Sequence, residues 1–119
     1  MSSASGPAVT AVRTAAEVGR ANRRAGRELE RAAQVALEGA GWFVLRTGPG
    51  QAGVVDLVAL AMDDLWFVQC KVSGYLPPAE REYLRSLAAV YGVRPKVATW
   101  EKPAKGPRHV TFRNLEDEA

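Results

Sequence analysis

Three polar residues, Asp56, Gln69 and Lys71, interrupt apolar segments at a spacing that can bring them together. Asp56 lies within the apolar run VVDLVAL, where an ionised carboxylate is costly to bury unless it is paired or binds a cation. Gln69 and Lys71 are two residues apart at the end of the strand-like run DLWFVQCKV, so their side chains leave one face of a strand. If both runs pair as a hairpin around MDD, the three groups converge at one end of a sheet.

These groups suit metal-assisted hydrolysis of a phosphodiester. Mg²⁺ prefers oxygen ligands, and Asp56, Gln69 and the main-chain carbonyl of Cys70 can supply them. A bound metal lowers the pKa of water and offsets transition-state charge, while Lys71 can orient or help to deprotonate that water. We therefore expect Mg²⁺ as cofactor, with Mn²⁺ as a substitute, and no small-molecule cofactor. Taken alone, Asp56 is also explained as a salt-bridged or capping residue at a strand end.

An upstream helix offers a second acid and a basic surface. Glu28 and Glu30 are two residues apart, so they point in different directions and only one can face the site. The same stretch is rich in arginine, which suits binding to a phosphate backbone. Its five arginines are Arg20, Arg23, Arg24, Arg27 and Arg31. The alternative is a solvated helix face in which arginine serves helix propensity.

Length and composition limit the class of protein. A chain of 119 residues, 47% of them hydrophobic, fits one compact domain with a real core. Its one cysteine excludes an internal disulfide framework and fits a reducing cytoplasm. The sequence has no apolar run of membrane-spanning length, and its N-terminus does not resemble a secretory signal. We expect a cytoplasmic protein with no membrane partner.

The order of elements predicts an α/β fold with a mixed sheet flanked by helices. The expected order is α-β-β-β-α-β, with a candidate fifth strand. The elements are a helix from about Arg20 to Glu38, strands at 42–47, 54–60 and 65–72, a helix at 77–91, a strand at 95–101 and the candidate strand at 108–114. Residues 1–18 are expected to form a flexible tail, residues 19–115 the domain, and residues 116–119 an acidic tail.

The pattern resembles the PD-(D/E)xK nuclease superfamily, in which an aspartate precedes a short acidic-x-lysine strand and a glutamate comes from an upstream helix. Here Asp56, twelve intervening residues and Gln69-Cys70-Lys71 match it. More narrowly, the chain is similar to the archaeal-type Holliday junction resolvases. RRAGRELER matches their basic-Gly-x-x-x-Glu-Arg helix, GWFVLRTG their arginine-ended strand, GPGQAGVVDLVA their loop and strand, and PKVATW a later strand.

This resemblance implies a restriction-endonuclease-like domain and a Mg²⁺-dependent endonuclease that nicks four-way DNA junctions in pairs. Position by position, Glu30 is the helix carboxylate and a metal ligand, Asp56 is the central metal ligand, and Lys71 is the catalytic lysine. The glycine spacing and the following arginine favour Glu30 over Glu28. Gln69 completes the expected catalytic and metal-binding set. The residues expected to bind DNA are Arg23, Arg24, Arg27, Arg31, Arg46 and Gln51.

Paired nicks need two active sites and therefore predict a homodimer with two-fold symmetry. Its surface is expected on the second helix and adjoining sheet, with Leu76, Tyr83 and Tyr91. Gln69 departs from the resolvases, which usually carry glutamate there; a Gln-x-Lys version occurs in Mrr-like restriction nucleases. The alternatives are therefore an Mrr-like or repair nuclease acting on other DNA, and a non-catalytic DNA-binding protein of the same fold.

Overall fold

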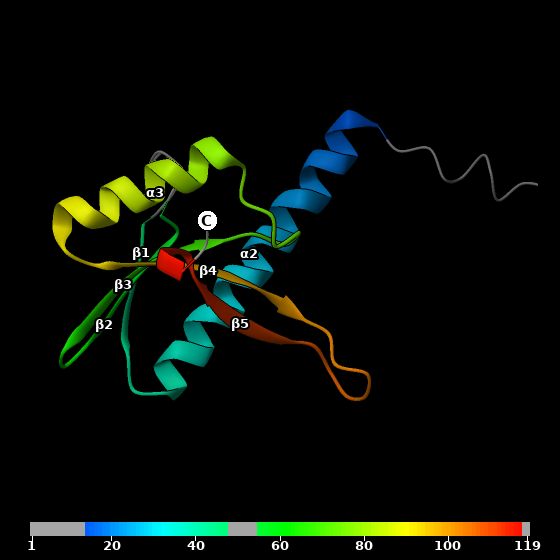
Figure 1. The fold of residues 1–119 in the computed structure, drawn as a ribbon. Helices are drawn as coiled ribbons and strands as arrows, with labels where there is room; N and C mark the ends of the chain where they lie inside the picture. Colours follow the sequence, from blue (N-terminus) through cyan, green and yellow to red (C-terminus); the bar gives the residue numbers. More distant parts are fainter. Residues whose placement is uncertain (1–13, 48–54, 118–119) are drawn as a thin grey trace, which may run out of the picture.

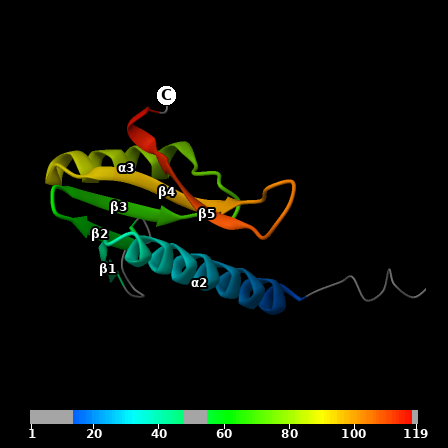
Figure 2. The same cartoon turned by 90° about the horizontal axis from the view of Figure 1, so that it is seen from below.

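The computed structural model describes residues 14–47 and 55–117, which form a five-stranded sheet with one helix on each face (Figures 1 and 2). The elements in chain order are α2 (Ala15–Gly39), β1 (Phe43–Arg46), β2 (Leu57–Ala61), β3 (Asp64–Cys70), α3 (Pro78–Tyr91), β4 (Arg94–Glu101), β5 (His109–Asn114) and the 3₁₀ turn η1 (Leu115–Asp117). The candidate fifth strand is therefore confirmed as β5.

The strands lie in the order β1-β2-β3-β4-β5. Pairing is antiparallel except between β3 and β4, which are parallel because α3 crosses over between them. The expected mixed sheet is confirmed. Its first three strands form an antiparallel meander. This topology brings together the ends of β1, β3 and β4 and the starts of β2 and β5. We refer to that end of the sheet as the carboxyl end of β3.

Helix α2 begins at Ala15, five residues before the predicted start at Arg20, so the expected tail is wrong for residues 15–18. The sequence Thr14-x-x-Glu17 forms a capping box: the Thr14 hydroxyl accepts the Glu17 N–H at 3.1 Å, and Glu17 Oε1 accepts the Thr14 N–H at 3.0 Å. Its buried residues, Leu29, Ala33 and Leu37, all lie in the second half. The first half consequently projects past the sheet (Figure 1).

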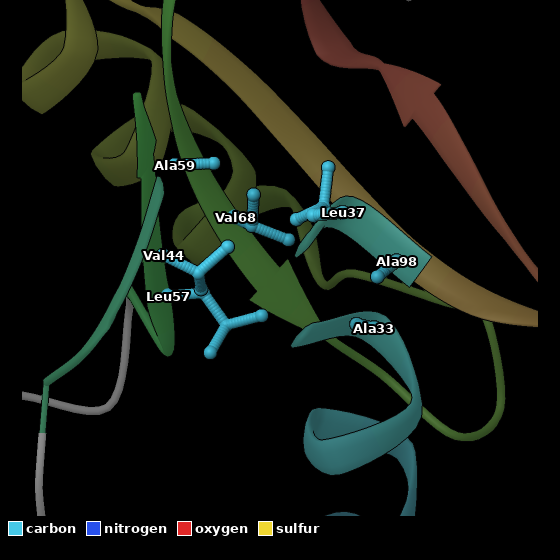
Figure 3. Packing of buried hydrophobic residues seen from close by; sticks show 7 residues of the cluster. All are labelled: Ala33, Leu37, Val44, Leu57, Ala59, Val68 and Ala98. Carbon is cyan, nitrogen blue, oxygen red and sulfur yellow. The ribbon is translucent and has the colours of Figure 1, made fainter. Parts of the chain in front are cut away.

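Two apolar clusters hold the helices to the sheet. The cluster under α2 consists of Ala33, Leu37, Val44, Leu57, Ala59, Val68 and Ala98 (Figure 3). Trp66 and Cys70 pack against this cluster, as their alternation with Gln69 predicts. The cluster under α3 consists of Leu76, Leu84, Val97 and Leu115. Within the described ranges, no helix is long and apolar enough to cross a membrane.

Two expectations about the second half of the chain need correction. Leu76 is only 1% exposed, because it fills the core under α3, and it cannot contribute to a dimer surface. Tyr83 and Tyr91 do remain exposed on α3. The folded part also runs past the predicted boundary at residue 115, since η1 continues to Asp117 and Arg85 donates two hydrogen bonds to the Leu115 carbonyl at 3.0 and 2.8 Å.

Candidate functional site

Asp56 lies at the start of β2, against the carboxyl end of β3. The register pairs Leu57 with Val68, which leaves Asp56 beside the last two residues of β3. Its backbone N–H donates to the Val68 carbonyl at 2.8 Å. Its Oδ2 accepts the Cys70 N–H at 2.7 Å, replacing the strand partner that Cys70 would otherwise have. The hairpin thus brings the Asp56 carboxylate to the backbone of Cys70, at the end of β3 where Gln69 and Lys71 also lie.

Thr47 holds the backbone of Asp56 from the neighbouring strand. Its N–H donates to the Asp56 carbonyl at 3.1 Å. Its hydroxyl donates to the Val55 carbonyl at 2.5 Å and lies 3.3 Å from the Asp56 carbonyl oxygen. Thr47 was not predicted from the sequence, although a hydroxyl directly after the strand that ends at Arg46 could have indicated a residue that supports the site. Thr47 therefore fixes the position of the Asp56 backbone, from which the carboxylate extends to β3.

The structure separates the two glutamates of α2. Glu30 faces the sheet end, where its Oε1 lies 4.0 Å from Arg46 Nη2. Glu28 points to the other flank of the helix and pairs with Arg108, which lies just before β5. The alternative left open by the spacing is therefore resolved in favour of Glu30, which is the glutamate beside Asp56.

Glu30 and Asp56 form a pair of half-buried carboxylates whose pKa values are raised despite the cations around them. Burial raises the pKa of Glu30, and the negative charge of Asp56 raises it further against the opposing effects of Arg46 and Arg27. Burial also raises the pKa of Asp56, although the Cys70 N–H and the Lys71 ammonium act in the opposite direction. A cation bound between the two carboxylates would relieve both effects.

Gln69 adds a buried oxygen to this end of the sheet. The residue is 4% exposed, and its Oε1 has no hydrogen-bond partner in the described part of the chain. An unpaired buried amide oxygen is costly, which makes it an available ligand. The N–H and C=O of a strand residue face the same strand edge, so the Cys70 carbonyl faces the side on which its N–H meets Asp56.

The Cys70 thiol itself is no nucleophile. Burial, helped by the charges of Asp56 and Glu30, raises the pKa of the thiol far above its ordinary range, so the thiolate is not formed at neutral pH. No three His, Cys, Asp or Glu side chains of the described residues form a metal-binding group. The groups near Asp56 that could bind a cation are oxygens, which are the ligands that hard cations such as Mg²⁺ prefer.

Lys71 follows β3 directly, and its N–H donates to the Ala98 carbonyl at 3.0 Å. Its Nζ forms an ion pair at 2.9 Å with Glu80, in the first turn of α3. Its charge also lowers the pKa of Asp56, so the ammonium interacts with the carboxylates of both Glu80 and Asp56. Glu80 was not predicted from the sequence, because its place beside Lys71 depends on how the loop after β3 folds. The signal available was an acidic residue in the first turn of the helix that Pro77-Pro78 opens.

The predicted DNA-binding arginines lie on two sides of α2. Helical spacing puts Arg23 and Arg27 on the flank of Glu30, and Arg24 and Arg31 on that of Glu28. All four of these side chains are exposed, and Arg46 joins the first group through Glu30. Gln51 lies outside the described residues. A basic surface therefore borders the two carboxylates.

Comparison with known proteins identifies a solved structure with the same fold. No protein-family model matches the sequence, and no curated protein is similar to it in sequence. Among the solved structures that match is Hjc, a Holliday junction resolvase from the archaeal hyperthermophile Archaeoglobus fulgidus. The TM-score is 0.59 at 24% sequence identity, over 76% of this chain and 73% of that chain. The two chains share a fold. The predicted restriction-endonuclease-like α/β domain is thereby confirmed, and the function must be argued from the site.

Proposed function

We propose that the protein is a metal-dependent endodeoxyribonuclease that cuts four-way DNA junctions. The observation that carries this proposal is the pair of half-buried, electrostatically coupled carboxylates of Glu30 and Asp56, at the end of the sheet where β3 also carries the unpaired buried oxygen of Gln69. Lys71 and the arginines of α2 lie around this set, where a phosphate would need them. The likeness in fold to a junction resolvase is consistent with this chemistry.

Asp56, Glu30, the Gln69 amide oxygen and the Cys70 carbonyl are the groups that would hold Mg²⁺ or Mn²⁺. When bound, the ion supplies a Lewis acid for the phosphate and lowers the pKa of a coordinated water. Water attacks phosphorus and the bond to the 3′-oxygen breaks. The water gives up a proton to solvent and the leaving 3′-oxygen takes one, so the products are a 5′-phosphate and a 3′-hydroxyl. Lys71 orients that water or stabilises charge on the phosphate oxygens, and Glu80 keeps its ammonium at the sheet end.

Recognition would rest on shape and backbone. The described residues form one small domain whose arginines suit phosphates, and no further element is left for reading base edges. Two symmetric nicks require a homodimer. For its surface we propose the exposed aromatic side of α3 and the sheet face that α3 leaves open. Tyr91 is 66% exposed and contacts the ring of Phe67 at 5.9 Å, while Phe43 of β1 is 63% exposed on the same face.

The first prediction concerns substrate choice. In Mg²⁺, the protein should cleave a synthetic four-way junction much faster than a linear duplex of the same sequence, because a branched substrate can contact both sides of α2 at once. Gel electrophoresis of end-labelled strands would measure both rates and show whether the nicks are paired. Equal cleavage of both substrates would rule out junction specificity.

The amide of Gln69 favours a second candidate, an Mrr-like or repair nuclease that acts on duplex, modified or flapped DNA. Equal cleavage in the preceding experiment would support it. Binding of both DNAs without any cleavage, in Mg²⁺ and in Mn²⁺, would instead indicate a non-catalytic DNA-binding protein of this fold.

A second prediction uses Gln69 to test the metal site without DNA. Gln69→Glu adds a third carboxylate and should tighten Mn²⁺ binding by roughly tenfold, since ligand charge largely sets the affinity of such sites. Gln69→Met removes the oxygen and keeps the bulk, so it should weaken binding. Calorimetry and Mn²⁺ electron paramagnetic resonance would measure both. Identical affinities in parent and both variants would show that Gln69 is not a ligand.

A further inference from the structure

The connection between β4 and β5, residues 102–108, extends from the same end of the sheet as the candidate site. Because β4 runs parallel to β3, both strands end there, and the hairpin projects beyond the end of β3 (Figure 2). Neighbouring strands are about 4.8 Å apart, so β5 lies roughly 10 Å from the strand that carries Gln69. The hairpin is therefore a close neighbour of the site.

Arg108 fixes the position of this hairpin. Its guanidinium lies over the ring of Trp100, 3.9 Å from the centroid, and its Nη2 pairs with Glu28 on α2. Gly106 makes the chain reversal with a φ of 93°, a conformation that other residues rarely adopt. The base of the hairpin is thus tied to both the sheet and α2, which orients the hairpin relative to the arginines of the helix.

The hairpin carries two lysines that form no ion pair with any of the described residues. These two residues, Lys102 and Lys105, are exposed. The acidic residues nearest in the fold have other partners: Glu101 pairs with His109 at 3.5 Å, and Glu28 pairs with Arg108. Two exposed cations beside a phosphodiester site suit further phosphates of the same DNA.

The dimensions of duplex DNA agree with this placement. Duplex DNA carries one charge per roughly 1.7 Å of axis, and its major groove is about 12 Å wide. A duplex with one phosphate at Asp56 and Lys71 therefore has further phosphates along its length that can reach a hairpin at the same end of the sheet. Arg23 and Arg27 lie on the flank of Glu30, whereas the hairpin meets α2 on the flank of Glu28. The two groups can contact DNA on both sides of the helix.

We propose that the β4–β5 hairpin is a second backbone-binding surface, on which Lys102 and Lys105 bind phosphates of a duplex arm flanking the cleaved bond. Arg108 is a positioning residue that holds the hairpin against α2. The inference rests on the proposed function, because it concerns the DNA that the same site would cut.

The test is the double variant Lys102→Gln/Lys105→Gln, with binding to a four-way junction measured by fluorescence anisotropy in EDTA over a range of salt. Each lost phosphate contact lowers the slope of log K against log salt by about 0.9, so the slope should fall by about 1.8. Near 0.1 M salt the affinity should fall by between about tenfold and hundredfold. The rate at saturating DNA in Mg²⁺ should stay at the parent value, since neither lysine contacts the reacting atoms.

Arg94→Gln is the control, because Arg94 is an exposed cation at the opposite end of β4, where it pairs with Asp64 at 3.3 Å. This variant should keep the parent's slope. A double variant with an unchanged slope, in a parent that binds and cuts DNA, would overturn the hairpin proposal alone. A parent that neither binds nor cuts DNA would overturn the proposed function and the hairpin with it.

Discussion

Replacing Asp56 by asparagine should lower the rate of DNA cleavage by about 10³-fold or more while the protein stays folded. The change removes the charged oxygen on which the proposed Mg²⁺ site depends, and losing one such group commonly costs several powers of ten. Asparagine is nearly the same size, and its side-chain oxygen can still accept the Cys70 N–H. The loss should therefore be chemical. Single-turnover cleavage of a junction, with binding measured separately, would check it.

The melting temperature of Asp56→Asn should change in the opposite direction to its cleavage rate. Because the pKa values of Asp56 and Glu30 are raised by folding, both groups bind protons more tightly in the folded chain than in the unfolded one. In the parent, stability contributed by the protonated forms is present below pH ~4 and is lost as the pH rises through the raised values. Asp56→Asn removes one charge of the pair, so its melting temperature at pH 7 should equal or exceed that of the parent.

Asp63→Asn is the matched control, since Asp63 is an exposed acid in the turn between β2 and β3, at the far end of the sheet. It should cleave and melt like the parent. An Asp56→Asn protein that cuts DNA at the parent's rate would refute the proposed site. A sharp fall in its melting temperature would show that Asp56 is a structural cap, the alternative reading of the sequence.

Replacing Lys71 by glutamine should lower the cleavage rate by about 10²- to 10⁴-fold, the range expected for a group that assists proton transfer or stabilises transition-state charge. Glutamine keeps a polar end that can hydrogen-bond to Glu80 but has no charge. Binding should change by no more than one phosphate contact, which alters the salt slope by about 0.9. Cleavage at saturating DNA, together with the salt dependence of binding, separates the two effects.

Glu80→Gln distinguishes the lysine from its partner. The ion pair is partly exposed, with side-chain exposures of 28% for Lys71 and 42% for Glu80. Such pairs contribute about 0–1 kcal/mol, so releasing the ammonium should change the rate by less than about tenfold. If Glu80→Gln is as damaging as Lys71→Gln, the essential group is the ion pair, and the role given to Lys71 alone is wrong.

Much of the fold follows from local signals. Alternation in β3 puts Cys70 and Trp66 on the face opposite Gln69, and the MDD turn predicted the pairing that places Asp56 at the end of β3. The start of α2 was missed because Thr14-x-x-Glu17, a capping box, lies in a stretch of small residues that reads as a loose tail.

The rest depends on tertiary geometry. Glu28 and Glu30 flank the buried Leu29, one on each side, and a stripe that includes Ala32 and Ala36 does not decide between them. Only Ala33 and Leu37 are buried with Leu29, and that stripe turns toward Glu30, so the packing of α2 on the sheet decides which glutamate meets Asp56. The pairing of Glu80 with Lys71 likewise depends on tertiary structure, because the loop after β3 places the first turn of α3 beside the end of that strand.

Under the proposed function, the projecting half of α2 would link DNA binding to local folding. It has no fully buried side chain, so its helical state depends on the Thr14 capping box and on propensity, which are weak for so short a segment. Arginines three and four residues apart repel one another along it: Arg20, Arg23, Arg24 and Arg27. Phosphates that neutralise these charges would favour the helix itself. DNA would then stabilise the helical state of this segment. The free energy needed to order the segment would lower the net free energy of binding.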